Sequence, residues 1–137
     1  DLSANCRLAA ESLARIEARA PLVAQEYRAR LTERLQRNLA DLDMELDLAG
    51  VVREVALFAE RADVSEEIMR LRSHLEQFEA ITAAPESAGR KLEFVSQEML
   101  RETNTIGSKA NDVEIAQYVI EIKTAVERIR EMLQNVE

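Results

Sequence analysis

Apolar residues recur every three or four positions along most of the chain, which is the spacing of a helix with one buried face. The pattern is most regular in residues 113–137. Its apolar positions step alternately by four and three residues: Ile115, Val119, Ile122, Val126, Ile129, Leu133 and Val136. This 3.5-residue repeat is typical of a coiled-coil-like seam. It predicts a long helix that packs on an earlier helix of the chain or on another subunit.

Residues 1–62 also predict long helices. Residues 2–18 fit one helix, and from Val23 onward apolar residues continue at similar intervals: Tyr27, Leu31, Leu35, Leu39, Leu42 and Leu46. Pro21 disfavours helical geometry at the residue before it, but it is tolerated in a helix's first turn. Pro21 therefore either separates two helices or lies within one long helix. Gly50 is a second position where the pattern can break.

Residues 63–84 predict another helix, which Asp63 or Ser65 can cap. A connector follows, since the run from Ala83 to Gly89 contains both Pro and Gly. The next segment, residues 85–112, predicts a helix with four apolar residues on one face: Leu92, Val95, Met99 and Ile106. This helix ends between Gly107 and the turn signal Asn111-Asp112.

Composition agrees with these helices and with no other fold class. The 137 residues include only three Gly and two Pro, with 47% apolar and 32% charged residues, which suits amphipathic helices. We expect an all-α protein of long antiparallel helices in a bundle or in coiled-coil-like hairpins, and an oligomer. The single cysteine excludes an internal disulfide and fits a cytoplasmic location. No apolar run is long enough to span a membrane.

The net charge of −8 argues against general affinity for nucleic acid, because binding to phosphates requires Lys and Arg. The charge is unevenly spread. Residues 1–40 carry seven Arg against five acids, and residues 90–111 carry four basic residues against three acids. Residues 41–89, in contrast, carry four Arg against twelve acids. We expect any contact with a polyanion in the first helix or in residues 90–111.

Carboxylates and amides are the main candidates for chemistry. Glu98 and Glu102 are four residues apart and project from the same helix face, with three polar neighbours: Gln97, Arg101 and Asn104. Two convergent carboxylates can hold Mg²⁺ or Mn²⁺, which can activate water. The alternative is an ordinary solvated face on which Glu and Arg form pairs.

Histidine, basic and aromatic residues add further candidates. His74, the sole histidine, belongs to a polar stripe with Glu67, Arg70 and Gln77. It is either a base or metal ligand or a structural residue at the edge of a core. Arg90, Lys91 and Lys109 can bind phosphates. The three phenylalanines, Phe58, Phe78 and Phe94, and two methionines, Met99 and Met132, are expected in the core.

Two segments resemble the bacterial YicC/YloC family in their order of residues. One runs from Gly89 to Asp112 and reads Gly-Arg-Lys-Leu-Glu-Phe, then Gln-Glu-Met and Arg-Glu-Thr-Asn-Thr-Ile-Gly-Ser-Lys-Ala-Asn-Asp. The other runs from Ala62 to Phe78, and the last nine residues are similar as well. The resemblance covers residues 50–137 well, and residues 1–49 only as helical pattern. Glu93 stands where the family has Asp, and Leu100 where Asn is common.

The resemblance implies the helical C-terminal portion of a metal-dependent endoribonuclease, a homo-oligomer that cleaves RNA and whose separate N-terminal domain is absent here. It implies Mn or Mg as cofactor and gives Glu98, Glu102 and His74 catalytic and metal-binding roles. It makes five residues RNA contacts: Arg90, Lys91, Arg101, Asn104 and Lys109. The alternative is a non-catalytic module for oligomerisation or partner docking through the 115–136 seam. The two readings are compatible.

Overall fold

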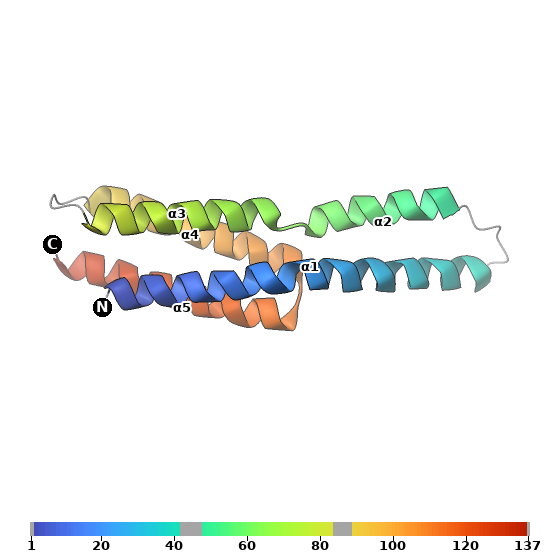
Figure 1. Ribbon diagram of the computed structural model, residues 1–137, viewed down its shortest axis with the longest axis horizontal. Helices are drawn as coiled ribbons and strands as arrows, with labels where there is room; N and C mark the ends of the chain where they lie inside the picture. Colours follow the sequence, from blue (N-terminus) through green and yellow to red (C-terminus); the bar gives the residue numbers. More distant parts are fainter. Residues whose placement is uncertain (1, 42–47, 84–88, 137) are drawn as a thin grey trace.

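Five helices make up the part of the chain that the computed structural model describes, which is residues 2–41, 48–83 and 89–136 (Figure 1). The helices are α1 (Leu2–Asp41), α2 (Leu48–Ala62), α3 (Ser65–Ala83), α4 (Gly89–Ala110) and α5 (Val113–Val136). The predicted all-α class is therefore confirmed. Leu42, Leu46 and most of the predicted connector, residues 84–88, lie outside the described residues.

The helices form a body and an arm (Figure 1). In the body, α3, α4 and α5 pack with the first half of α1 around one core. The arm consists of residues 22–41 of α1 and of α2, which runs beside them. Two α2 residues, Val55 and Ala59, are buried in the arm and lie outside the core of the body. No described helix is both long enough and apolar enough to cross a membrane.

The predicted seam of α5 is buried within this chain. Its residues Ile115, Val119, Ile122, Val126 and Ile129 are all in the core, while the side chain of Val136 lies outside the described residues. The first half of α1 packs against α5 and has a matching 3.5-residue repeat: Cys6, Ala9, Leu13 and Ile16. The same core extends to Val23 at the start of the arm. Complete burial of a Val or Ile contributes about 1.5–3 kcal/mol, so this seam is a main source of stability.

Helix α1 continues through Pro21 without interruption. A proline inside a helix lacks one N–H donor and crowds the carbonyl four residues earlier. Pro21 borders the cavity that α1 shares with α2 and α3, and buried residues of α1 lie on both sides of the proline, Ile16 before it and Val23 after it. Packing at both sides therefore holds the helix together. Gly50 likewise lies inside α2 rather than between helices.

Aspartates cap two of the helices. The Ser65 backbone N–H and the Ser65 hydroxyl both donate to Asp63 Oδ1, at 3.0 and 2.6 Å, which confirms Asp63 as the cap of α3. At the start of α5, the Ile115 N–H donates to Asp112 Oδ2 at 3.1 Å. Arg19 of α1 also donates from Nε and Nη2 to the Asp112 carboxylate, both at 3.3 Å. Asp112 therefore caps α5 and ties it to α1.

The turn between α4 and α5 contains Asn111, whose φ of 43° lies in the left-handed region that Asn tolerates. Gly107 does not end α4 but lies inside it. A Cβ at Gly107 would come within 3.3 Å of Val119 Cγ1, so the glycine permits α4 to approach α5 closely. The helix therefore ends at the later of the two predicted positions.

Two of the three phenylalanines are not in the core. Phe78 is fully buried together with Met99, as predicted, but Phe58 is 41% exposed and Phe94 is 61% exposed. Phe58 lies in the two-helix arm, where each helix has fewer neighbours to cover it. Phe94 lies on α4 away from the body's core. Met132 is only partly buried.

We predict that Asp112→Ala lowers the free energy of unfolding of the chain by about 1–2 kcal/mol, because α5 loses its N-cap. Asp112→Asn can still accept the Ile115 hydrogen bond and should be clearly more stable than the alanine variant. Urea denaturation followed by circular dichroism measures both. Equal stability of the alanine variant and the wild type would contradict the capping role.

The same residue gives a pH-dependent prediction. Hydrogen bonds from Arg19, and then from the Ile115 N–H, hold the pKa of Asp112 below its ordinary value. Folding therefore favours the charged carboxylate, and this stabilisation is complete above the unfolded pKa of about 3.9. It is lost as the pH falls through the lower folded pKa. The stability difference between wild type and Asp112→Asn should therefore be present at neutral pH and shrink in acid.

Candidate functional site

Two ion pairs join α3 to α4 and set the alignment of these antiparallel helices. Near the start of α3, Glu67 Oε1 lies 2.8 Å from Lys109 Nζ near the end of α4. About one turn further along α3, Arg70 Nε donates to Glu102 Oε1 at 3.0 Å. Because the partners are 42 and 32 residues apart in sequence, these pairs form only when the two helices are packed together.

The two carboxylates of these pairs are buried. Glu67 is 3% exposed and Glu102 is 7% exposed, while their partners Lys109 and Arg70 are each only partly covered. Arg70 also lies 3.5 Å from Glu67, and its hydrogen bond to Glu102 raises the pKa of the Arg70 guanidinium. A buried carboxylate is costly unless it is paired. Burial of the acids therefore fixes where the two cations lie at the surface.

His74 lies one turn beyond Arg70 on α3 and is partly buried. Its Nδ1 atom is buried and has no hydrogen-bond partner within the described structure. Because the helices are antiparallel and Arg70 pairs with Glu102, the next turn of α3, with His74, is expected opposite the preceding turn of α4, with Glu98. Glu98 is partly buried and makes no ion pair or hydrogen bond with the described residues.

The predicted residues of α4 divide into two strips. Lys91, Glu98, Glu102 and Lys109 are separated by seven, four and seven residues, so they follow one line along the helix. This line faces α3, since Glu102 and Lys109 contact it. Of the other three predicted residues, Arg101 and Asn104 are exposed on the outward face, and Arg90 is exposed at the start of α4, where it borders a cavity with Gln77 of α3. We call the α3-facing set the polar edge: Glu67, Arg70, His74 and Gln77 of α3 with Lys91, Glu98, Glu102 and Lys109 of α4.

The polar edge does not contain a complete metal site by itself. In the described part of the chain, no three His, Cys, Asp or Glu side chains lie together in a way that could hold a metal ion. Glu102 also forms an ion pair with Arg70. Glu–Arg pairing on a solvated helix face was the alternative to a metal site predicted from the sequence, and this pair agrees with it in part, although its arginine belongs to α3. The assignment of a divalent metal to Glu98, Glu102 and His74 therefore stays a prediction.

Glu67, Arg70 and Gln77 are the polar-edge residues that the site prediction missed. All three belong to the polar stripe with His74, and the stripe itself is visible in the sequence. The missing information was the alignment of α3 with α4, which a single sequence does not contain. The available signal in the sequence was that one predicted helix carries the carboxylate of Glu67 and the next carries the ammonium group of Lys109, and opposite charges on neighbouring helices can pair.

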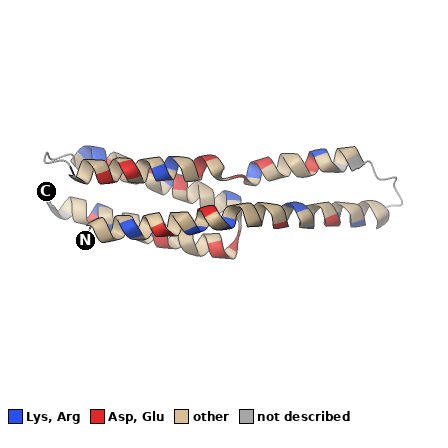
Figure 2. Cartoon of the chain, in the orientation of Figure 1, with Lys and Arg blue, Asp and Glu red and all other residues tan. Residues whose placement is uncertain are grey.

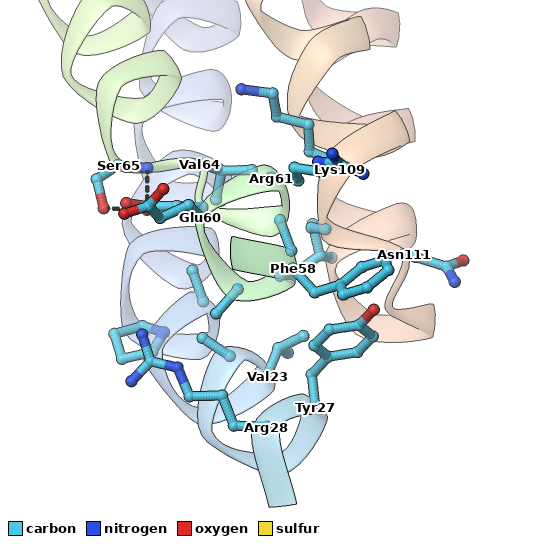
Figure 3. Close-up of a pocket in the computed structure, with 18 of the residues that line it drawn as sticks. Val23, Tyr27, Arg28, Phe58, Glu60, Arg61, Val64, Ser65, Lys109 and Asn111 are labelled. Atoms are coloured by element: carbon cyan, nitrogen blue, oxygen red, sulfur yellow. Dashed lines mark hydrogen bonds between the residues drawn. The ribbon is translucent and has the colours of Figure 1, made fainter. Parts of the chain in front are cut away.

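A cavity lies near each end of α4. The smaller, about 350 Å³, is bordered by Arg90, Lys91 and the exposed Phe94, together with Gln77 of α3. Figure 2 shows these basic residues where α4 begins, at the end of the body away from the arm. The larger, about 990 Å³, lies where the arm joins the body and includes Lys109 (Figure 3). Acidic and basic residues are interleaved between these two places (Figure 2).

Residues 16–137, which include the arm and the whole polar edge, match the family described as endoribonuclease YicC-like, C-terminal, and the chain belongs to this family. The predicted resemblance is confirmed and extends well into α1, where the sequence showed only helical pattern.

Two curated relatives have the name probable endoribonuclease YicC. The protein from Clostridioides difficile is 39% identical over 137 residues, which is 100% of this chain and 46% of the relative. The protein from Haemophilus influenzae is 37% identical over 123 residues, which is 90% of this chain and 42% of the relative. The chain thus spans less than half the length of these relatives.

We predict that Arg70→Met destabilises the chain by about 1–3 kcal/mol, because it leaves Glu102 buried without its hydrogen bond. The double variant Arg70→Met/Glu102→Met should recover roughly half of this loss or more, since no unpaired carboxylate remains. Arg128→Met, at an exposed position of α5, is the matched control and should change little. Urea denaturation of the wild type, Arg70→Met, Glu102→Met and the double variant gives the coupling energy, with Arg128→Met measured beside them. Additive effects of the two substitutions would contradict the pairing.

Proposed function

We propose that this chain is the helical C-terminal part of a cytoplasmic endoribonuclease that cleaves RNA phosphodiester bonds, and that the polar edge is its contribution to the cleavage site. The observation that carries the proposal is the pairing of Arg70 with Glu102 and of Glu67 with Lys109, which aligns the stretch of α3 around His74 with the stretch of α4 around Glu98 and Glu102. Cations lie along the same edge on both sides of them. The names of the family and of the two relatives support the reaction class.

The polar edge offers two of the elements that phosphodiester cleavage needs. Lys91, Arg70 and Lys109 are cations that can contact the phosphates of a bound strand. Glu102 acts as a positioning residue, because its buried carboxylate holds the Arg70 guanidinium. Glu98 is the carboxylate free of described ion pairs, so it is the candidate to accept a proton from the attacking hydroxyl or water. His74 is the second candidate for proton transfer.

A divalent ion, Mg²⁺ or Mn²⁺, is part of the proposal. Such an ion would supply activation of water and neutralisation of charge on the phosphate. Glu98 is the available oxygen ligand, with Glu102 and His74 beside it, but the described residues do not complete a ligand set. The remaining ligands would come from the N-terminal domain or from another subunit of a homo-oligomer.

The dimensions of α4 suit an RNA strand that runs along the polar edge. Lys91 and Lys109 are eighteen residues apart, which corresponds to about 27 Å at 1.5 Å per residue. Glu98 and Glu102 lie between them. A strand held by both lysines would therefore pass over the carboxylates. Arg90 borders the same cavity as Lys91, whereas Arg101 and Asn104 face outward and would contact RNA only if it also covered that face.

The alternative function is a helical module for oligomerisation or partner docking. Its main support was the 3.5-residue seam of α5, which the sequence left without a partner. Because α1 and α4 of the same chain cover that seam, it no longer favours a second subunit. The polar edge is therefore stronger evidence for the cleavage function than the seam is for oligomerisation.

Cleavage of a labelled RNA by the full-length protein with Mn²⁺ or Mg²⁺ tests the proposal. We expect Glu98→Gln to lower the cleavage rate about 100-fold or more, in the range of lost acid–base groups, and His74→Ala to lower it as well. Glu54→Gln, an exposed glutamate of α2 without a described ion pair, is the control and should cleave normally.

Three outcomes separate the parts of this proposal. Unchanged cleavage by both Glu98→Gln and His74→Ala would contradict the assignment of the polar edge to the cleavage site. Full cleavage in the presence of a chelator would contradict the role of a metal ion but not the proposed cleavage of RNA. Activity of the full-length protein, with none for this chain alone, would show that the chain supplies only part of the site.

A further inference from the structure

The larger cavity, about 990 Å³, lies where the arm meets the body (Figure 3). Its walls come from α1, α2, the start of α3 and the end of α4. The polar edge reaches it through Lys109, which borders the cavity and also pairs with Glu67. The volume is within the usual range of ligand sites, about 300–1,000 Å³.

The cavity is basic although the chain is acidic overall. Its lining includes six basic residues, Arg28, Arg30, Arg34, Arg61, Arg72 and Lys109, against three acids, Glu17, Glu60 and Asp63. Glu17 pairs with Arg72, and Lys109 pairs with Glu67 outside the cavity, so these two cations are already neutralised. The arginines Arg28, Arg30 and Arg34 have no ion pair with the described residues. A positive surface thus remains for an anionic ligand.

The pKa of Asp63 is consistent with this surface. The pKa is lowered first by the Ser65 hydroxyl and then by the Ser65 backbone N–H. The charges of Lys109 and Arg28 lower it further, from α4 and α1. Positive charge from two sides of the cavity therefore acts on a carboxylate at its border.

Two aromatic rings border the same cavity, Tyr27 from α1 and Phe58 from α2 (Figure 3). Both are partly exposed, which is unexpected for a phenylalanine that packs only inside a protein. The Arg61 guanidinium lies 5.5 Å from the centre of the Phe58 ring. Exposed aromatic rings among arginines are typical of sites for single-stranded nucleic acid, where bases stack on the rings and cations contact the backbone.

We propose that this cavity binds a single-stranded segment of RNA, with a base stacked on Phe58 or Tyr27 and phosphates contacted by Arg28 and Arg61. Arg30 and Arg34 continue the basic surface along the arm. Because Lys109 belongs to both places, a strand held here leads onto the polar edge. The inference rests on the proposed ribonuclease function and adds to it a separate subsite that selects unpaired RNA.

The test measures binding of the full-length protein to a fluorescent RNA 12-mer and to the same sequence as a duplex, by anisotropy at several salt concentrations. A chelator is present, and a gel confirms that the RNA is intact. We expect single-stranded RNA to bind better, and Phe58→Leu to weaken its binding about tenfold or more. Phe58→Tyr should keep most of the affinity. Thermal unfolding shows that each variant is folded.

The arginine gives an independent readout. Arg28→Gln should weaken binding and also reduce the slope of log affinity against log salt by about 0.7, the value for one lost phosphate contact on a single strand. Arg53→Gln is the control, because Arg53 is exposed on α2 but does not line the cavity. A 4-thiouridine in the 12-mer should cross-link to a peptide that contains Tyr27 or Phe58.

Wild-type affinity and salt slope in both Phe58→Leu and Arg28→Gln would overturn the subsite, and so would equal binding of the duplex. Cross-links confined to residues 90–94 would contradict it as well. If Glu98→Gln then still abolishes cleavage, the proposed function stands without the subsite. If the cavity variants weaken binding while Glu98→Gln cleaves normally, the subsite stands and the cleavage site is elsewhere. Absence of RNA binding by the wild type would overturn both.

Discussion

The burial of two carboxylates between α3 and α4 is the constraint on which the candidate site depends. Glu67 and Glu102 must be paired because water does not reach them, and their partners Lys109 and Arg70 lie on the facing helix. Hydrophobic packing alone would permit the two helices to slide, but these pairs require one alignment. That alignment brings His74 level with Glu98 and places three cations along the same edge.

Much of the fold could be predicted from the sequence, because a 3.5-residue repeat has few structural solutions. The seam of α5, the buried face of α4 and the Asp63 cap were all predicted. Sequence could not decide how Pro21 is accommodated, since the packing of α5 and α2 on either side of it is a tertiary effect. The prediction that Phe58 and Phe94 lie in the core was wrong for a related reason. Periodicity shows that a helix has an apolar face but not how many neighbouring helices cover that face.

The candidate site was predicted less completely. Glu98, Glu102, His74, Lys91 and Lys109 were named from their residue types and from the family resemblance, and the structure places them on one edge. Arg101 and Asn104 were named by the same reasoning but face outward, since adjacency in sequence does not mean a shared helix face. Arg90 borders a cavity beside Lys91 at the start of α4. Glu67 and Arg70 were seen only as a polar stripe. A charged residue is normally expected to be solvated, so its burial can be predicted only when the residue that pairs with it is known.

The account depends on the α3-facing edge of α4, rather than its outward face, being the surface on which RNA is cleaved. The most direct measurement is the single-turnover cleavage rate of the full-length protein in Lys91→Met and Arg101→Met. Both residues are exposed basic positions of α4 without a described ion pair, and they differ in the strip they occupy. The account predicts slower cleavage for Lys91→Met and a near wild-type rate for Arg101→Met. A wild-type rate for Lys91→Met with a strong loss for Arg101→Met would contradict it.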